Sequence, residues 1–306
     1  MKYEVIIVGG GPAGMSAANL LARARRTVLL LDSGTGRNAP VESIHLLVSR
    51  DGVDPGKFRE QAHQQLARYT DLHIAAGSAV DISGRQGDFT VRTHEGARYR
   101  GNRVLLATGL SDDLPQIDGL QHKWGKSAFL CPYCDGWEVR DRPLSVFVTA
   151  QKELPFAMMM TRWSPQVTVL TCGDLDLGKR DRGILDSLGA VVEERPVVGV
   201  TGPGGSMESV VLDDGQELAS SAMFLHTKTK QRSDLPRQLG CTLLEDGCVE
   251  VDHANKTSVP GVYAAGDMAR PVYQPVPIAY VAAAANDGLV AAGFIDADLF
   301  GSSFQQ

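Results

Sequence analysis

The chain has 306 residues, enough for two domains, and 43 % of them are hydrophobic, which allows a sizeable core. The net charge is only −6 and no basic stripe stands out, so we expect no nucleic-acid partner. Five cysteines do not make a disulfide scaffold in a chain of this length. The first apolar run is too short for a signal peptide, and the apolar stretch 278–295 carries Asn286 and Asp287 in its middle. We therefore expect a soluble, cytoplasmic protein without a membrane partner.

The N-terminal segment predicts a β-α-β unit with a dinucleotide-binding turn. Its first strand, helix and second strand are expected over 2–8, 12–24 and 27–31. Between the first strand and the helix, Gly9, Gly11 and Gly14 match the pattern Gly-x-Gly-x-x-Gly. These glycines allow a tight turn, a close approach of a pyrophosphate, and close helix–strand packing. The phosphates would lie at the helix N-terminus, and Asp32 at the end of the second strand would accept hydrogen bonds from ribose hydroxyls.

The next part of the first domain is less regular. We expect a helix over 55–69, an exposed hairpin over 89–100 and a strand over 104–107 that stops at Thr108 and Gly109. The stretch 113–126 is rich in Pro, Gly and Asp, which is typical of a linker.

Residues 131–135 read Cys-Pro-Tyr-Cys-Asp, which predicts a redox-active dithiol. Cys131 and Cys134 can close a small disulfide, and Asp135 gives the pair a proton partner. The alternative is half of a zinc site, which needs a further pair of ligands. Cys241 and Cys248 have no nearby His, so no metal is expected, and together with Cys172 we interpret them as packed or incidental thiols.

A second β-α-β unit follows the dithiol, and the pattern of the first domain returns from about residue 246. The second unit is expected over 144–149, 154–163 and 167–171, followed by strands and a hairpin within 189–200 and 207–218. Two strands and a closing helix complete the chain. We therefore predict an α/β fold of two Rossmann-like, three-layer ββα domains. One comprises 1–115 and 246–306 and carries the dinucleotide-binding turn, and the other, 116–245, is inserted into it and carries the dithiol.

Residues 257–267 support FAD rather than NAD as the ligand of the first domain. They resemble the second FAD motif of two-dinucleotide flavoproteins, in which a strand delivers Gly266 and Asp267 and the carboxylate meets the ribityl chain.

Taken together, these motifs resemble the low-molecular-weight thioredoxin reductase family over nearly the whole chain. The resemblance rests on the first glycine turn, Ala107-Thr108-Gly109, the Cys-x-x-Cys-Asp-Gly motif and Gly266-Asp267. It implies that Cys134 faces the flavin, that Cys131 exchanges with substrate, that Asp135 handles the proton, and that the protein is a homodimer. It also implies that Gln274 lies beside the pyrimidine edge of the flavin, and that Pro275 and Pro277 open the last helix. The expected FAD-binding residues are Gly9, Gly11, Pro12, Ala13, Gly14, Asp32, Ser33, Asn38, Thr108, Gly109, Gly266, Asp267, Gln274 and Pro275.

One part of the family pattern is absent. The second β-α turn, which holds NADPH in the family, has no glycine between Leu144 and Cys172, and Glu153 adds a negative charge there. The basic residues expected for a 2′-phosphate are replaced by the acidic stretch with Asp174 and Asp176. NADPH is therefore not expected as the electron donor, although a divergent but working site remains the alternative.

The functional hypothesis is an FAD-dependent thiol-disulfide oxidoreductase that takes its electrons from a second flavin or a ferredoxin-type donor. A second FAD in the former NADPH pocket is one form of this hypothesis. Three alternatives stay open: a dithiol oxidase that closes a disulfide in a small molecule with oxygen as acceptor, an NADPH-dependent thioredoxin reductase, and a redox sensor without turnover.

Overall fold

The computed structural model describes residues 1–173, 175–302 and 304, and the chain divides into two compact units. Unit 1 comprises Met1–Ala39, Val53–Ser111 and Thr229–Gln306, and unit 2 comprises Pro40–Gly52 and Asp112–Lys228. The return to the first unit therefore comes at Thr229 rather than near residue 246, because Leu235 and Cys241 pack in the core of unit 1. The assignment of 40–52 to unit 2 was not anticipated.

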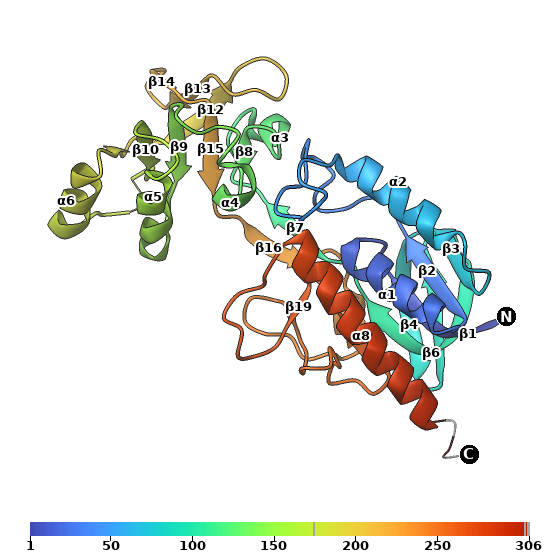
Figure 1. The fold of residues 1–306 in the computed structure, drawn as a ribbon. Coiled ribbons are helices and arrows are strands. Elements are labelled where there is room, and N and C mark those ends of the chain that lie inside the picture. The colour runs from blue at the N-terminus through green and yellow to red at the C-terminus, as the bar shows by residue number, and fades with distance from the viewer. Residues whose placement is uncertain (174, 303, 305–306) are drawn as a thin grey trace. The chain divides into compact units, whose positions relative to one another are not determined.

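Unit 1 is built on a seven-stranded sheet whose central part is parallel (Figure 1). The parallel strands lie in the order β3-β2-β1-β6-β18, with Val5 opposite Val28 on one side and Arg103 on the other. On the side of β6 where its second half pairs with β18, its first half pairs with β5. Strand β5 in turn pairs with β4, and the three strands form an antiparallel meander. These strands are β1 (Lys2–Val8), β2 (Val28–Asp32), β3 (Leu72–Ala76), β4 (Ala79–Arg85), β5 (Asp88–Thr93), β6 (Arg98–Leu106) and β18 (Val262–Ala264).

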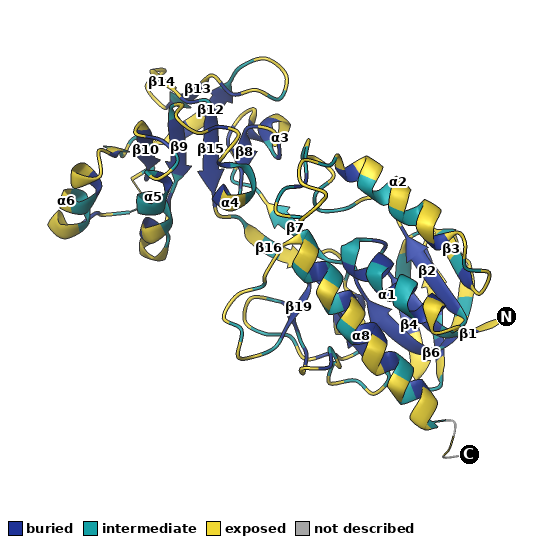
Figure 2. Ribbon diagram, in the orientation of Figure 1, coloured by how far each residue is buried: buried dark blue, intermediate teal, exposed yellow. Residues whose placement is uncertain are grey.

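Two helices, α1 (Pro12–Arg23) and α8 (Val281–Ser302), pack side by side on one face of this sheet. They approach so closely that a Cβ on Gly288 would lie 2.0 Å from the carbonyl oxygen of Ala13. Figure 2 shows the central strands buried, whereas the outward faces of α8 and α2 (Pro55–Leu66) are exposed. On the opposite face, the central strands share a core with side chains from β4 and β5. The segments that contain α7 (Leu235–Gln238), β17 (Val249–Glu250) and β19 (Ala269–Arg270) pack into the same core.

Unit 2 has a five-stranded parallel sheet in the order β11-β10-β9-β15-β8 and a separate three-stranded antiparallel sheet, β12-β13-β14. Helices α5 and α6 pack on one face of the parallel sheet, and the antiparallel sheet contributes to the core on the other. The strands are β8 (Ala128–Phe129), β9 (Leu144–Phe147), β10 (Val167–Leu170), β11 (Val191–Glu193), β12 (Val197–Thr201), β13 (Ser209–Leu212), β14 (Glu217–Ala219) and β15 (Ala222–Leu225). The helices are α3 (Leu120–Lys123), α4 (Pro132–Asp135), the 3₁₀ turn η1 (Gln151–Glu153), α5 (Leu154–Met160) and α6 (Lys179–Ser187). Where the chain passes between the units, β7 (Leu110–Asp113) pairs with β16 (Lys228–Gln231).

The stretch 113–126 is not a linker, which corrects the expectation from its composition. Ile117 and Leu120 are buried in the core of unit 2. The ammonium group of Lys123 is buried as well and donates hydrogen bonds of 2.6–2.9 Å to three carbonyl oxygens in the loop 202–206. Gly and Pro interrupt the regular elements here, but the apolar residues between them still pack.

The last helix begins at Val281, so the prediction that Pro275 and Pro277 open it was wrong. These prolines lie in the irregular segment between β19 and α8, just after a turn in which the backbone N–H of Gln274 donates to the carbonyl oxygen of Pro271. Within the described part of the chain, no helix is both long enough and apolar enough to cross a bilayer.

Candidate active site

The first glycine turn of unit 1 is a candidate anion-binding site at the start of α1. Gly9 has φ +112°, and a Cβ on Gly14 would lie 1.9 Å from the carbonyl oxygen of Gly9, so glycine is required at both positions. A Cβ on Gly11, by contrast, would meet no described atom within 4 Å, which leaves space in front of the helix. Among the described residues no side chain caps α1, and Pro12 stands in its first turn. Its first N–H groups are therefore available to a phosphate.

Two acids and two arginines surround this turn. Asp32, buried at the end of β2, forms an ion pair with Arg59, which also donates a 2.9 Å hydrogen bond to the carbonyl oxygen of Gly10. Asp267 pairs with Arg37 at 3.0 Å. The arginines supply positive charge for a pyrophosphate, and the carboxylates supply acceptors for sugar hydroxyls. These residues fit the expected FAD.

Arg37 and Arg59 could not be found from the sequence, because single arginines in a loop and on a helix carry no spacing signal. Asp287 is a third residue that sequence reasoning did not place here. Burial raises the pKa of its carboxyl group, which accepts a backbone hydrogen bond from Gly266 and lies near Asp267.

The remaining predicted cofactor residues lie at several places in unit 1. A Cβ on Gly266 would lie 3.1 Å from that of Ala13, so the second FAD motif does reach the first turn. The backbone N–H and hydroxyl of Thr108 lie 3.2 and 3.4 Å from the sulfur of Met268, and Gly109 has φ +71°. Ser33 is exposed beside Thr35, and Asn38 is half-buried. The side chain of Gln274 donates to the carbonyl oxygen of Val276 at 2.8 Å, next to exposed Pro275, so their place beside the flavin stays a prediction.

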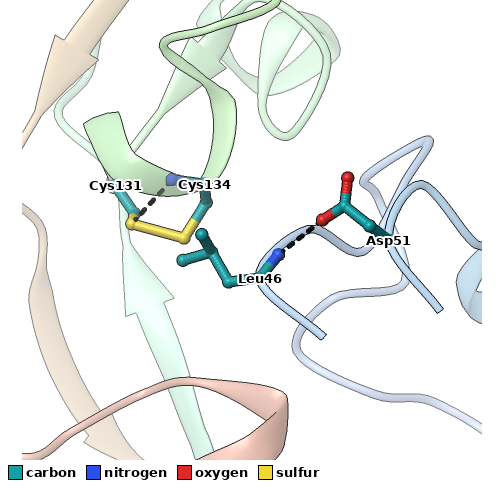
Figure 3. Close-up of a disulfide and its surroundings, with 4 residues drawn as sticks. All are labelled: Leu46, Asp51, Cys131 and Cys134. Carbon is teal, nitrogen blue, oxygen red and sulfur yellow. Dashed lines mark hydrogen bonds between the residues drawn. A yellow bond between two sulfur atoms is a disulfide. The ribbon is translucent and has the colours of Figure 1, made fainter. Parts of the chain in front are cut away.

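The dithiol lies in unit 2 at the N-terminus of the short helix α4. Cys131 and Cys134 form a disulfide with Cα atoms 5.3 Å apart. Cys131 is the N-cap residue, and its sulfur accepts a 3.2 Å hydrogen bond from the backbone N–H of Cys134. In Figure 3 the side chain of Leu46, from the segment 40–52 of the same unit, points toward the disulfide. Tyr133, between the two cysteines, and Trp137, three residues after Cys134, are exposed.

Asp135, directly after the second cysteine, is suited to exchange protons near neutral pH. Burial raises the pKa of its carboxyl group to about 7, while the imidazole of His45 lowers it and the carboxylate of Glu138 raises it. An acid with such a pKa can either donate a proton to a leaving thiolate or accept one from a thiol.

The second β-α turn, between β9 and α5, differs from the first in one decisive respect. The carboxylate of Glu153 accepts hydrogen bonds from the backbone N–H groups of Thr149 (3.0 Å) and Ala150 (3.2 Å). Beyond it, the rings of Phe156 and His226 lie 4.3 Å apart, centroid to centroid. The chain's own carboxylate therefore occupies donors that a bound pyrophosphate would use at such a turn.

The acidic stretch after β10 is described only in part. Asp174 lies outside the described residues, and Asp176 is exposed. Two exposed basic residues at the start of α6, Lys179 and Arg180, were not anticipated from the sequence. A third, Arg182, pairs with Glu194.

Comparisons with known proteins agree with this geometry. The family model "Pyridine nucleotide-disulphide oxidoreductase" matches residues 3–284. A probable thioredoxin reductase of Arthroderma benhamiae is 32 % identical over 298 residues, covering 87 % of this chain and 74 % of the relative. The thioredoxin reductase sirT of Leptosphaeria maculans is 31 % identical, covering 90 % and 89 %.

Solved structures give the same result. An oxidoreductase from Agrobacterium tumefaciens has a TM-score of 0.91 and 33 % identity, covering 98 % of this chain and 99 % of the other. A putative thioredoxin reductase TrxB from Bacillus anthracis also has a TM-score of 0.91, with 29 % identity and the same coverage. The chain therefore belongs to the pyridine nucleotide-disulphide oxidoreductase family and is a thioredoxin reductase-like, FAD-dependent disulfide oxidoreductase.

Proposed function

We propose that this enzyme exchanges dithiols and disulfides through Cys131 and Cys134 without using NADPH. The observation that carries the proposal is the contact of Glu153 with the N–H groups of Thr149 and Ala150. The first turn of the chain leaves its phosphate-binding donors open, whereas the second turn is closed by its own carboxylate. A pyrophosphate at the second turn would have to displace Glu153 and would be repelled by its charge.

The contact of Glu153 with these N–H groups also bears on the choice of electron donor. A second FAD would need the same N–H groups for its own pyrophosphate, so Glu153 opposes it as it opposes NADPH. Phe156 and His226 also face each other here, beyond the ends of the neighbouring parallel strands β9 and β15, where α/β sheets usually bind ligands. Of the two donors expected from the sequence, a ferredoxin-type protein is therefore favoured over a second flavin.

The chemistry assigned to the dithiol is an exchange of disulfides. The glycine turn and Asp32 of unit 1 would hold FAD, which would supply or accept the electron pair. The Cys131 thiolate attacks a sulfur of the substrate disulfide, which breaks that bond and forms a mixed disulfide. Cys134 then attacks Cys131, closes the internal disulfide and releases the second thiol. Asp135 exchanges the proton, and Cys134 is assigned as the sulfur that exchanges electrons with the flavin. Because the relatives are named thioredoxin reductases, a thioredoxin-type protein is one candidate substrate.

A dithiol oxidase is the second candidate, since the closure by Glu153 favours it equally. An enzyme that takes its electrons from its own dithiol substrate needs no nucleotide-binding turn. The exposed apolar side chains of Leu46, Tyr133 and Trp137 offer contact area to a small organic dithiol.

An anaerobic titration of the oxidised enzyme separates these functions. NADPH and NADH should leave the flavin band unchanged at micromolar concentration, whereas dithionite should bleach it. The variant Glu153→Ala frees both N–H groups and should bind NADPH more tightly than the wild type. Rapid bleaching of the wild type by micromolar NADPH would refute the proposal and restore an ordinary NADPH-linked reductase. Lys179 and Arg180 would then be the residues to test for phosphate binding.

The same flavin absorbance assay identifies the electron donor or acceptor. If a reduced ferredoxin drives turnover of a disulfide and reoxidation by oxygen is slow, the reductase is supported. If a dithiol bleaches the flavin and oxygen restores it rapidly, the enzyme is a dithiol oxidase. A flavin that cycles once with dithionite but turns over with neither partner would indicate a redox sensor.

We also propose a homodimer, as the family resemblance implies. A run of exposed apolar side chains in unit 1, with Val272, Tyr273, Val276 and Ile278, supports self-association because monomers rarely expose such a patch. Light scattering at micromolar concentration tests this, and the mass of a single chain would contradict it.

A further inference from the structure

The segment 40–52 belongs to unit 2 and carries a histidine to the dithiol helix. The imidazole of His45 is largely buried, with 18 % of its side chain exposed. Its Nδ1 lies 3.2 Å from an oxygen of Asp51, and its Nε2 lies 3.6 Å from an oxygen of Glu138, three residues after Asp135. The histidine is thus held between its own loop and the turn that follows α4.

The loop around His45 is built to keep this position. The second oxygen of Asp51 accepts a 2.8 Å hydrogen bond from the backbone N–H of Leu46, and the N–H of Gly52 donates to the carbonyl oxygen of Ile44 at 2.8 Å. Leu46 has φ +62°, which turns the chain sharply directly after His45. Figure 3 shows the result: Asp51 holds the loop from behind while Leu46 points toward the disulfide.

The charges around His45 come from both elements that pack against it. Asp51 contacts it from its own loop and Glu138 from the turn after the dithiol helix, and the carboxyl group of Asp135 on that helix feels its charge electrostatically. Each ring nitrogen lies near a carboxylate oxygen, Nδ1 near Asp51 and Nε2 near Glu138. A cation at this place favours the ionised form of Asp135, whereas burial favours the neutral form.

We propose that His45 is a positioning residue that sets, through Asp135, the pH at which the dithiol exchanges with a disulfide. The inference rests on the proposed function, in which Asp135 handles the proton. In that exchange the thiolate released from the substrate takes its proton from the Asp135 carboxyl group. The carboxylate left behind is stabilised by the imidazolium of His45, and solvent later returns the proton. No electrons pass through His45.

The test is a pH profile of a single turnover. The enzyme is reduced anaerobically with dithionite, freed of excess reductant, and mixed with an aromatic disulfide whose thiol product is coloured. In a plot of rate against pH, one limb should reflect the ionisation of Asp135. Removing the positive charge with His45→Gln should shift this limb to higher pH by about one pH unit. His45→Lys also removes the imidazole, but it keeps a positive charge and should not move the limb upward.

Three further outcomes separate this inference from the proposed function. Asp135→Asn should abolish the limb, and in that background His45→Gln should have no further effect on the profile. If Asp135→Asn leaves the limb in place, the role of Asp135 in the proposed function fails. If Asp135→Asn abolishes the limb but His45→Gln and His45→Lys lower the rate alike at every pH, only the role of His45 is refuted.

A second variant keeps the test decisive if His45→Gln does not fold. Asp51→Asn retains His45 and an oxygen for the backbone N–H of Leu46, but removes the negative charge beside Nδ1. It should shift the limb upward, in the same direction and by less. A downward shift or an unchanged profile would overturn the inference.

Discussion

Replacing Asp135 with asparagine should make the stability of unit 2 less dependent on pH. The pKa of this carboxyl group is about 7 in the folded protein, against 3.8 for an ordinary aspartate, because the folded chain buries it. Since the folded-state pKa is the higher one, the stabilisation by the bound proton is fully present below 3.8 and is lost as the pH rises through 7.

The size of the effect follows from the pH interval in which only the folded form holds the proton. Each pH unit in that interval is worth about 1.4 kcal/mol. Between about pH 5 and about pH 8, the wild type should therefore lose about 3 kcal/mol of unfolding free energy through this group. Asparagine does not titrate, so Asp135→Asn should not show this pH-dependent loss. The difference in unfolding free energy between the wild type and Asp135→Asn should therefore change by about 3 kcal/mol over the same pH range.

The sequence provides a probe confined to the relevant unit. All three tryptophans, Trp124, Trp137 and Trp163, lie in unit 2. Urea unfolding followed by tryptophan fluorescence, with the disulfide intact and FAD in equal excess, measures both proteins at each pH. Titrating groups that do not interact with Asp135 cancel in the difference. If the wild type and Asp135→Asn lose stability in parallel across this range, burial does not raise the pKa of Asp135 and the reasoning is wrong.

Three further predictions concern the cofactor turn, the core of unit 2 and the dithiol. Gly11→Val should fold normally by circular dichroism yet purify without flavin, whereas Gly14→Ala should destabilise the turn itself; full flavin occupancy in Gly11→Val would contradict the assigned pyrophosphate site. Lys123→Met should cost about 3 kcal/mol in urea unfolding because three carbonyl groups lose the buried ammonium group that donates to them, and an unchanged midpoint would show that water replaces it. Cys134→Ser should accumulate a stable mixed disulfide on Cys131, detectable by mass spectrometry, and preferential trapping in Cys131→Ser would reverse the two roles.

The sequence predicted best those parts of the fold that are encoded locally. The first β-α-β unit is a continuous apolar strand, a glycine turn and a small-residue helix, so the boundaries of α1 and β2 differ from the expected ones by one residue. The polar helix α6, Lys179–Ser187, was missed because it buries only Leu185 and therefore lacks a clear apolar period. The four-residue strand β15 was missed because so short a buried run has no period of its own.

The candidate site was predictable only as far as its residues form motifs. The dithiol, the glycines and the charge of Glu153 can be read from the chain, but the contact of that carboxylate with two N–H groups depends on the tertiary structure. The same is true of Arg59 against Asp32 and of His45 against Glu138. These pairs are separated by 27 and 93 residues, and no local pattern connects them.

The placement of 40–52 in unit 2 changes how the protein can be assembled during synthesis. A simple insertion crosses between domains twice, whereas this chain crosses at residues 39–40, 52–53, 111–112 and 228–229. At ordinary translation rates, the segment that carries His45 leaves the ribosome roughly 3 to 12 s before Asp112, the first residue of its partner segment. All residues of unit 2 have been synthesised once Lys228 is made. At that point α8, which packs against α1, has not yet been synthesised. The dithiol-bearing unit should therefore mature first, and the apolar face of α1 should remain a target for chaperones until the last helix is complete.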